Sequence, residues 1–359
     1  MNNKKPNEIL WEELRFLRQR PQKQSKKRKA KQTKRPVAAW MAEDRLYSGK
    51  GKELCAILKT RACTWARSKS GGCTMCGYYN DRGLDDTPGE DIYNQIQSIF
   101  KKFEKELNNP NENIAFKIFN SGSFMDPQEI PREIQHQILA EIAAYPSVKE
   151  IIIESLPQFI TETALNNYKT HLNNKWLEIG VGLETANDYI RTNIINKPFS
   201  WKKFEETVSM VQERGWGIRT YLLFKPPFLS ELNAIYDLIF SIQECLKLGV
   251  NTISINPTNI QNHTICSQLE NENCYRSPWY YSLFMAIKAS ITQEELESCR
   301  IICAPSGQGS PRGIHNCRDR SCNTEARQHL EKFVLEQDLG KIPTHFDCSC
   351  YNEWKHTLY

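Results

Sequence analysis

The central part of the chain alternates short apolar runs with longer segments in which apolar residues recur every three or four positions. Short runs rich in β-branched residues predict strands, and the longer spacing predicts amphipathic helices. Six runs have the strand pattern, at 54–58, 114–120, 148–155, 176–184, 217–224 and 250–257. Strands that alternate with helices are typical of βαβ units, so we expect a parallel sheet in an α/β fold.

The clearest helical pattern lies between the first two predicted strands. Apolar side chains there recur at helical spacing, at Ile92, Ile96, Ile99, Phe103 and Leu107. The predicted strands are almost continuously apolar, which suits strands that are covered on both faces. A partial (β/α)6 TIM-like barrel therefore fits better than a half-exposed antiparallel sheet, and its functional groups would lie at the carboxyl ends of the strands.

The regular alternation fades after residue 260 into a Cys-rich region with many Gly and Pro residues. We therefore predict three parts: a basic tail at 1–36, a catalytic core at 37–260 and a C-terminal extension at 261–359. The chain has 13 cysteines among 359 residues. In a large chain of a reducing compartment, clustered cysteines hold metal more often than they form disulfides.

Charge is distributed unevenly along the chain. Residues 1–36 carry 13 Lys or Arg and three Glu, whereas the remainder carries 34 basic and 39 acidic residues. The segment 23–36 has almost no apolar residues, so we expect the tail to be disordered. A mobile polycation attracts phosphate groups, which favours contact with nucleic acid. A purely solubilising tail is the alternative.

The chain shows no sequence signal for export or membrane insertion. The first twenty residues lack the apolar core of a secretory signal, and no stretch approaches the roughly 18 apolar residues of a membrane span. We therefore expect a cytoplasmic protein with no membrane partner.

Three cysteines follow the first predicted strand in a C-x9-C-x2-C arrangement, at Cys63, Cys73 and Cys76. Gly71 and Gly72 allow a tight turn before the last two cysteines. Three thiolates can ligate three irons of a cubane and leave the fourth iron open to a cofactor. Structural zinc is the alternative, but it normally needs four protein ligands, and no fourth Cys or His follows nearby.

Clustered cysteines after the first strand of a β/α array resemble the radical S-adenosylmethionine (SAM) superfamily. The commonest spacing in that superfamily is C-x3-C-x2-C, and the x9 variant is similar to the catalytic subunit of elongator, a tRNA-modifying enzyme. The resemblance implies a 4Fe-4S cluster and SAM as cofactors. It also implies a 5′-deoxyadenosyl radical that abstracts a hydrogen atom from the substrate.

Other strand ends extend the resemblance. Ser121, Gly122 and Ser123 follow the second predicted strand, where the superfamily has a turn that receives the methionine amino group of SAM. Glu154 and Glu184 end the third and fourth predicted strands. A carboxylate can accept hydrogen bonds from a ribose diol or an ammonium group. Glu184 thus resembles the SAM-contacting position after the fourth strand.

The motifs RACTWARSKSGGCTMCGYYN, NSGSFMDP and VGLETAND, together with the terminal HNC and CSC elements, are similar to the radical SAM proteins of archaeosine biosynthesis, the RaSEA family. This resemblance implies action on tRNA at a 7-deazaguanine of the D-arm that already carries a lysine adduct. The partner ArcS would install the adduct, an electron donor would be needed, and radical C–N cleavage would leave archaeosine. Lys197, Arg219 and Lys225 lie near predicted strand or loop ends and could bind anions, but we expect them to be solvated surface cations.

The C-terminal region contains Cys317, Cys322, Cys348 and Cys350 on either side of one predicted helix. These thiols predict a metal site, with zinc preferred, that would hold the extension together. His315 or Cys303 could replace one ligand. A second iron-sulfur cluster and plain buried thiols are the alternatives.

Two competing functions remain at this point. One is an elongator-like modifier of tRNA, but that family adds an acetyltransferase domain, for which about a hundred residues after the last predicted strand are too few. The other is a non-catalytic RNA-binding protein whose cysteines hold only structural zinc.

Overall fold

The computed structural model describes residues 6–18, 33–81 and 87–358. Its strands follow chain order. They are β1 (Ala38–Leu46), β2 (Gly49–Ile57), β3 (Ile114–Phe119), β4 (Val148–Glu154), β5 (Trp176–Glu184), β6 (Gly217–Phe224), β7 (Thr252–Pro257) and β8 (Arg300–Ile302). Neighbours β2 to β5 pair in parallel, as do β6, β7 and β8.

Helices connect the strands. The longer ones are α1 (Pro6–Arg18), α4 (Gly89–Lys102), α6 (Arg132–Ala144), α7 (Glu162–Lys169), α8 (Trp201–Gln212), α9 (Glu231–Lys247), α11 (Tyr280–Ser290) and α13 (Arg320–Glu336). The shorter ones are α3 (Thr64–Arg67), η1 (Tyr78–Asp81), α5 (Glu104–Leu107), η2 (Pro157–Phe159), η3 (Ile190–Ile194), α10 (Ile265–Asn271), α12 (Glu295–Ser298), η4 (Leu339–Lys341) and α14 (Cys350–His356). No helix among the described residues is both long enough and apolar enough to cross a membrane.

All six predicted strands are present, as β2 to β7, and the α/β class with a partial (β/α)6 barrel is confirmed. Two strands were missed. The strand β1 pairs antiparallel with β2 in a hairpin, and its largely half-buried residues lack the apolar run that marks the other strands. The strand β8 has only three residues, too few for a periodic pattern.

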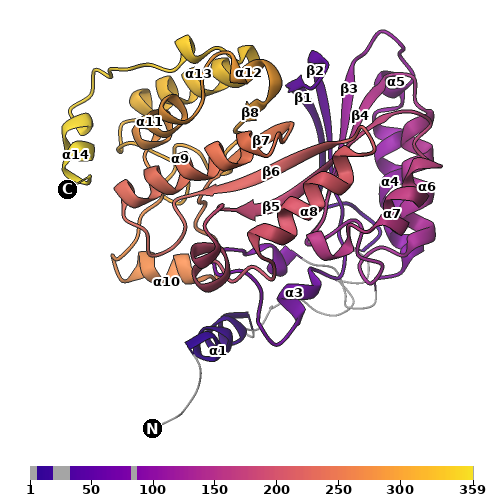
Figure 1. Ribbon diagram of the computed structural model, residues 1–359, viewed down its shortest axis with the longest axis horizontal. Coiled ribbons are helices and arrows are strands. Elements are labelled where there is room, and N and C mark those ends of the chain that lie inside the picture. Colours follow the sequence, from indigo (N-terminus) through magenta and orange to yellow (C-terminus); the bar gives the residue numbers. More distant parts are fainter. Residues whose placement is uncertain (1–5, 19–32, 82–86, 359) are drawn as a thin grey trace. The chain divides into compact units, whose positions relative to one another are not determined.

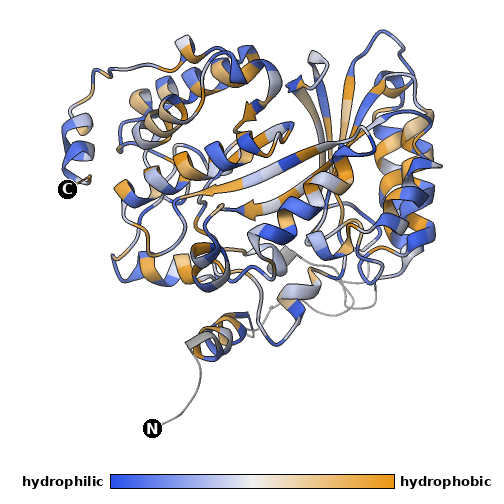
Figure 2. Cartoon of the chain, viewed as in Figure 1, coloured by the Kyte–Doolittle hydropathy of each residue, from blue (hydrophilic) through white to orange (hydrophobic). Residues whose placement is uncertain are grey.

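The chain divides into two compact units. The first comprises residues 1–72, 77–182 and 206–218. In its sheet, Lys117 of β3 is buried and forms ion pairs of 2.5 Å with Asp44 of β1 and 2.7 Å with Glu53 of β2. The helices α4 and α6 pack against each other and α6 against β4, and both show hydrophobic and hydrophilic faces (Figures 1 and 2).

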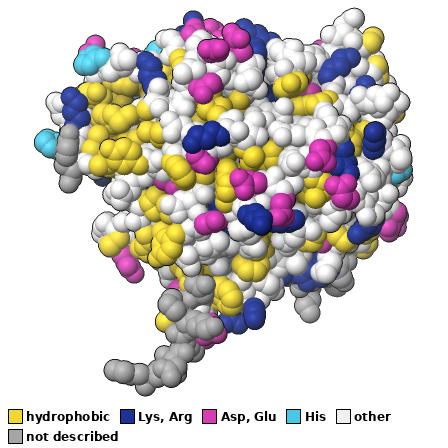
Figure 3. Space-filling view, in the orientation of Figure 1, with side chains coloured by type: hydrophobic (Ala, Val, Ile, Leu, Met, Phe, Trp, Pro, Cys, Tyr) yellow, Lys and Arg dark blue, Asp and Glu magenta, His cyan; other side chains and the backbone are white. Residues whose placement is uncertain are grey.

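The second unit comprises residues 73–76, 183–205 and 219–359. Its helices α9 and α11 pack side by side (Figure 1). The helix α11 is apolar on nearly all sides and buries eight of its 11 residues. On the face drawn in Figure 3, basic and acidic side chains are interspersed. That mixture agrees with the near-balance of charge outside residues 1–36.

The helix α1 lies within the segment that the sequence predicted to be a disordered basic tail. Its Leu14 and Leu17 side chains are buried, so part of the tail folds onto the first unit. The sequence interpretation missed this helix because it weighed the basic residues of the tail as a whole. Most of the strongly basic segment 23–36 lies outside the described residues. The three-part division of the chain stays a prediction.

Candidate functional site

Cys63, the first cysteine of the triad, lies in the loop that follows β2. Its backbone N–H donates to the carbonyl oxygen of Ser121 at 3.2 Å. The next residue, Thr64, donates its hydroxyl to the Asp126 carboxylate, and the Arg61 guanidinium donates to the carbonyl of Gln128 at 3.1 Å. The loop after β2 is therefore fixed to the loop after β3 on both sides of the cysteine.

Gly71 and Gly72 end the part of the cysteine loop that belongs to the first unit. Both have positive φ angles, of 73° and 82°, which favour glycine. A Cβ on Gly71 would lie 2.8 Å from the Cβ of Leu14 in α1, and a Cβ on Gly72 would lie 2.8 Å from the Cα of Ala66. Both glycines are therefore required by the turn and by the close approach of neighbouring chain segments.

Cys73 and Cys76 lie at the two ends of a tight turn in the second unit. The N–H of Cys76 donates to the carbonyl of Cys73 at 3.3 Å. Between them, the buried Thr74 donates its backbone N–H to the carbonyl of Ile195 at 3.0 Å and its hydroxyl to that of Ile194, also at 3.0 Å. The turn is thus anchored to the end of η3, and both cysteines remain partly exposed.

The turn Ser121–Ser123 after β3 is built around the buried carboxylate of Glu129. One oxygen of Glu129 accepts the N–H of Ser123 at 3.1 Å. The other accepts the hydroxyl of Thr60 at 3.1 Å and the side-chain amide of Asn120 at 2.7 Å. Burial raises the pKa of this carboxyl to about 7, although the hydrogen bond from Ser123 favours its charged form.

Gly122 lies where any side chain would collide. A Cβ at this position would be 1.8 Å from Oε1 of Glu129 and 2.6 Å from the Cα of Cys63. The hydroxyl of the next residue, Ser123, accepts the N–H of Leu156, beyond β4, at 3.0 Å. Cys63, the Ser121–Ser123 turn and the segment after β4 therefore form one hydrogen-bonded assembly in the first unit.

The two predicted carboxylates have different surroundings. Glu154 ends β4, and its carbonyl accepts the N–H of Phe124 at 2.8 Å. Glu184 ends β5 in a left-handed conformation, with φ of 68°, and only 8% of it is exposed. Its carboxylate pairs with the amino group of Lys197 at 2.7 Å. If Glu184 contacts SAM, as the sequence predicted, it does so with a carboxylate whose position is already fixed by Lys197.

None of the three cations is solvated at the surface, so that expectation was wrong. Arg219 and Lys225 are buried, and the side chain of Lys197 is only 9% exposed. Lys197 pairs with Glu184, and Lys225 pairs with Glu231 at 2.7 Å. Arg219 is 2% exposed within β6. A buried charge requires partners, and the sequence could not show that carboxylates such as Glu231 would supply them.

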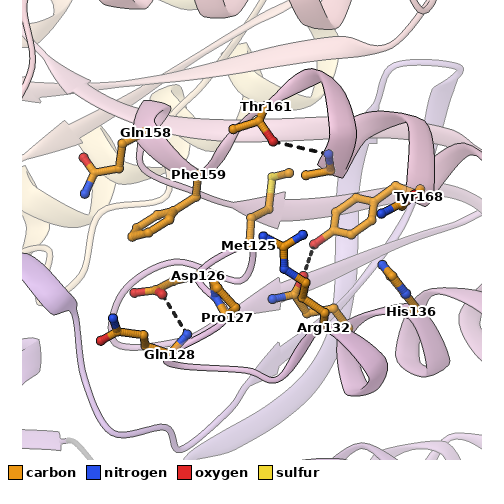
Figure 4. A pocket seen from close by; sticks show the side chains of 13 residues that line it. Met125, Asp126, Pro127, Gln128, Arg132, His136, Gln158, Phe159, Thr161 and Tyr168 are labelled. Carbon is orange, nitrogen blue, oxygen red and sulfur yellow. Dashed lines mark hydrogen bonds between the residues drawn. The ribbon is translucent and has the colours of Figure 1, made fainter.

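A small cavity of about 160 Å³ lies in the first unit between the loop after β3, α6 and α7. Figure 4 shows Arg132 and His136 from α6 at its lining, together with Tyr168 and Phe159. Cofactor pockets usually have volumes of about 300–1,000 Å³. This cavity is therefore too small to hold SAM, and none of the predicted cofactor residues lines it.

A second group of cysteines gathers in the second unit. Cys317, Cys322, Cys348 and Cys350 have sulfur atoms that all lie within 4.8 Å of one another. Two sulfur–sulfur distances are 3.9 Å, between Cys317 and Cys348 and between Cys322 and Cys350. Among the described residues, these four cysteines are the group whose ligand atoms lie close enough together to bind a single metal ion.

Two residues that organise the site, Glu129 and Thr74, were missed from the sequence, and a third, Lys197, was named but expected on the surface. Glu129 shapes the Ser121–Ser123 turn, Thr74 anchors the turn of the last two cysteines, and Lys197 pairs with Glu184. The polar Thr74 between two predicted ligands was a usable signal. Glu129 and Lys197 carried none, because a single glutamate or lysine in a connecting segment cannot be distinguished in sequence from a solvated surface residue. The ligand and cofactor-binding roles of the predicted residues stay predictions.

Comparison with known proteins identifies the family, although no family model matches the chain. Archaeosine synthase subunit beta of Methanosarcina acetivorans is 35% identical over 327 residues, which is 91% of the chain and 90% of that protein. The protein of the same name from Thermococcus kodakarensis is 31% identical over 320 residues, covering 89% of the chain and 95% of its own length. The solved Elp3 of Methanocaldococcus infernus, with an N-terminal deletion, has a TM-score of 0.49 and 13% identity, covering 68% of the chain and 59% of that structure. The chain therefore belongs to the archaeosine synthase subunit beta family, which confirms its sequence-based identification as a radical SAM enzyme.

Proposed function

We propose that the chain converts a lysine adduct of 7-cyano-7-deazaguanine in the tRNA D-arm to archaeosine by radical C–N cleavage. Its membership of the archaeosine synthase subunit beta family carries this proposal. The relatives are beta subunits, which supports the presence of a partner protein. We propose that an ArcS-like partner transfers lysine to the tRNA base. An electron donor completes the system, because SAM must be cleaved reductively.

We assign the 4Fe-4S cluster to Cys63, Cys73 and Cys76. Three thiols within one loop suit a cubane with one open iron, which needs no fourth protein ligand. The loop is well anchored at each end, since Cys63 bonds to Ser121 and Thr74 to Ile194 and Ile195. Such anchoring supports the assignment, because a cluster that is ligated at only three irons depends on the protein to hold its ligands in place.

We assign SAM to the turn Ser121–Ser123 together with Glu154 and Glu184. Asn120, which precedes the turn, supports this assignment. Its side-chain oxygen Oδ1 is buried and has no hydrogen-bond partner among the described residues. A buried unpaired acceptor is unfavourable, and the ammonium group of a bound methionine moiety would satisfy it.

The cluster and SAM would supply the radical, and the protein would supply position and exclusion of water. The loops after β2, β3 and β4 share hydrogen bonds through Ser121 and Ser123, so the bound cofactor would meet a pre-organised surface. The basic segment 23–36 would add electrostatic attraction for tRNA, with strong dependence on salt.

An anaerobic assay tests the proposal. Reconstituted wild-type protein is incubated with a reductant, SAM and tRNA that carries the lysine adduct, and 5′-deoxyadenosine and archaeosine are measured by mass spectrometry. We expect both products in wild-type reactions and neither with Cys73→Ala, while the exposed Cys274→Ser control retains them. Release of 5′-deoxyadenosine without archaeosine would contradict the assigned substrate and leave the radical SAM chemistry in place.

A further inference from the structure

The four-cysteine group of the second unit joins two short segments of the C-terminal region. Cys317 precedes α13 and Cys322 lies in its first turn, whereas Cys348 precedes α14 and Cys350 is its first residue. Each close sulfur pair takes one cysteine from each segment. The four thiols therefore lie together where the segments that begin α13 and α14 meet.

The spacing of the sulfur atoms favours one metal ion. Zinc binds four thiolates in a tetrahedron with Zn–S distances of about 2.3 Å, which places the sulfur atoms roughly 3.8 Å apart. The two close sulfur pairs, each 3.9 Å apart, match this edge, and the whole group lies within 4.8 Å. In a cubane each thiolate binds a different iron, so its sulfur atoms lie farther apart than around a single ion.

We propose that Cys317, Cys322, Cys348 and Cys350 bind one structural Zn²⁺ ion in a closed tetrahedral site. The ion fastens α14 to α13 and serves no step of the radical reaction. His315 and Cys303, the alternative ligands that the sequence left open, do not belong to this site. His315 uses one ring nitrogen at 2.8 Å from the carbonyl of Gly313 and the other at 2.8 Å from Arg276, and Cys303 lies outside the group.

The surroundings of the group suit thiolate ligands. The side-chain amide of Asn316 donates to the sulfur of Cys322 at 3.5 Å. The hydroxyl of Tyr281 lies 3.2 Å from the sulfur of Cys350 and 3.5 Å from that of Cys322. Hydrogen-bond donors around metal-bound sulfur orient the ligands and stabilise their charge.

A half-buried cation, Arg276, lies beside the proposed site and supplies a counter-charge. Zn²⁺ with four thiolates carries a net charge of −2, which is costly to bury without a counter-charge. The Arg276 guanidinium donates to the carbonyls of His315 and Asn316, at 3.1 Å and 3.3 Å, directly before Cys317. Its Nη1 is buried with no partner among the described residues. The arginine thus places positive charge beside the ligand loop.

The segment also needs additional stabilisation. The helix α14 has seven residues and buries only Cys350 and Trp354. Trp354 donates to the hydroxyl of Ser282 at 2.8 Å and packs near Tyr281, with ring centroids 5.5 Å apart. One tryptophan is a weak anchor for a terminal helix, and metal binding contributes directly to the folding of such segments.

Metal analysis of the full chain tests the proposal. After anaerobic cluster reconstitution and removal of loose metal, we expect one zinc per chain alongside the cluster iron. The double variant Cys322→Ser/Cys350→Ser should lose at least nine-tenths of the zinc and keep its iron, whereas Cys274→Ser should keep both. Conversely, the triple variant of Cys63, Cys73 and Cys76 to Ala should lose iron and keep zinc, so failure of the zinc site and failure of the cluster assignment are distinguishable.

A second measurement uses the wild-type chain and does not depend on the folding of a variant. Zinc is removed and replaced with Co²⁺, which should give the absorption bands of a tetrahedral cobalt–thiolate site, and one equivalent of Zn²⁺ should abolish them. Absence of zinc and of these bands would overturn the proposal. A Cys317–Cys348 disulfide in the isolated protein, or loss of iron instead of zinc in the double variant, would also overturn it.

Discussion

The backbone N–H of Cys63 donates a hydrogen bond of 3.2 Å to the carbonyl oxygen of Ser121. This contact joins the first predicted cluster ligand to the turn that we assign to the methionine end of SAM. Ser123 extends the connection to the segment after β4 through Leu156. The positions of the cluster ligand and of the cofactor turn are therefore coupled, and a change in one is expected to disturb the other.

Gly122→Ala tests this coupling. The added methyl group would lie 1.8 Å from Oε1 of Glu129 and 2.6 Å from the Cα of Cys63, so the backbone must shift. We expect SAM affinity to fall at least about tenfold, which corresponds to about 1.4 kcal/mol, together with partial loss of iron. Equilibrium dialysis and iron analysis measure the two effects. Gly340→Ala, where the nearest atom belongs to the exposed side chain of Asp338, is the control, and unchanged SAM affinity in Gly122→Ala would contradict the coupling.

Glu129 makes the stability of the first unit depend on pH. Its pKa is raised from 4.5 to about 7, mainly by burial. Between these values the unfolded chain has lost the proton that the folded chain keeps, so stability falls as pH rises. We expect the wild type to lose up to about 3 kcal/mol across this window through Glu129, and Glu129→Gln to lack this loss.

Urea denaturation between pH 4.5 and pH 8 measures the difference between the two proteins. The exposed Glu325 supplies a matched control, because Glu325→Gln should retain the pH dependence of the wild type. Parallel pH profiles for wild type and Glu129→Gln would show that Glu129 titrates normally in the folded chain.

Thr74→Val should weaken retention of the cluster. The valine keeps the shape of the side chain but leaves the carbonyl of Ile194 without the hydroxyl that donates to it at 3.0 Å. An unmet buried acceptor costs about 1–3 kcal/mol, so we expect iron to be lost to a chelator roughly tenfold faster. Iron absorbance followed over time provides the measurement. Thr74→Ser retains the hydroxyl and should restore slow loss, and equal rates for Val and Ser would refute an anchoring role.

The pair Glu184 and Lys197 separates cofactor binding from stability. Lys197→Met leaves the nearly buried Glu184 carboxylate without its partner at 2.7 Å, and we expect about 3 kcal/mol of destabilisation. The double variant Lys197→Met/Glu184→Met should recover most of that stability. If Glu184 contacts SAM, the double variant should still bind SAM at least about tenfold more weakly. Wild-type SAM affinity in the stable double variant would rule out the contact.

The apolar periodicity was sufficient to predict β2 to β7, because strands covered on both faces have continuous apolar runs. The hairpin strand β1 follows no such rule, since most of its residues are only half-buried and it is held through Asp44 to the buried Lys117. The helix α1, which buries Leu14 and Leu17, was missed because its segment was interpreted together with the basic residues that follow it.

The candidate site was predictable where function depends on residue type and local spacing. Cys63, Cys73 and Cys76 and the four C-terminal thiols fall in this class. Supporting contacts were not predictable, because Glu129 reaches back to Thr60 and Lys197 pairs with Glu184 only after folding. A glutamate or lysine of this kind cannot be distinguished in sequence from a solvated surface residue.

The most direct test of the central claim is nucleoside analysis of tRNA from a host that lacks the gene and is complemented with defined variants. The account predicts that archaeosine disappears and that its lysine-adduct precursor accumulates. Wild type and Cys274→Ser should restore archaeosine, while Cys73→Ala should not. Normal archaeosine in the deletion strain, or restoration by Cys73→Ala, would contradict the claim that this chain forms archaeosine by cluster-dependent radical chemistry.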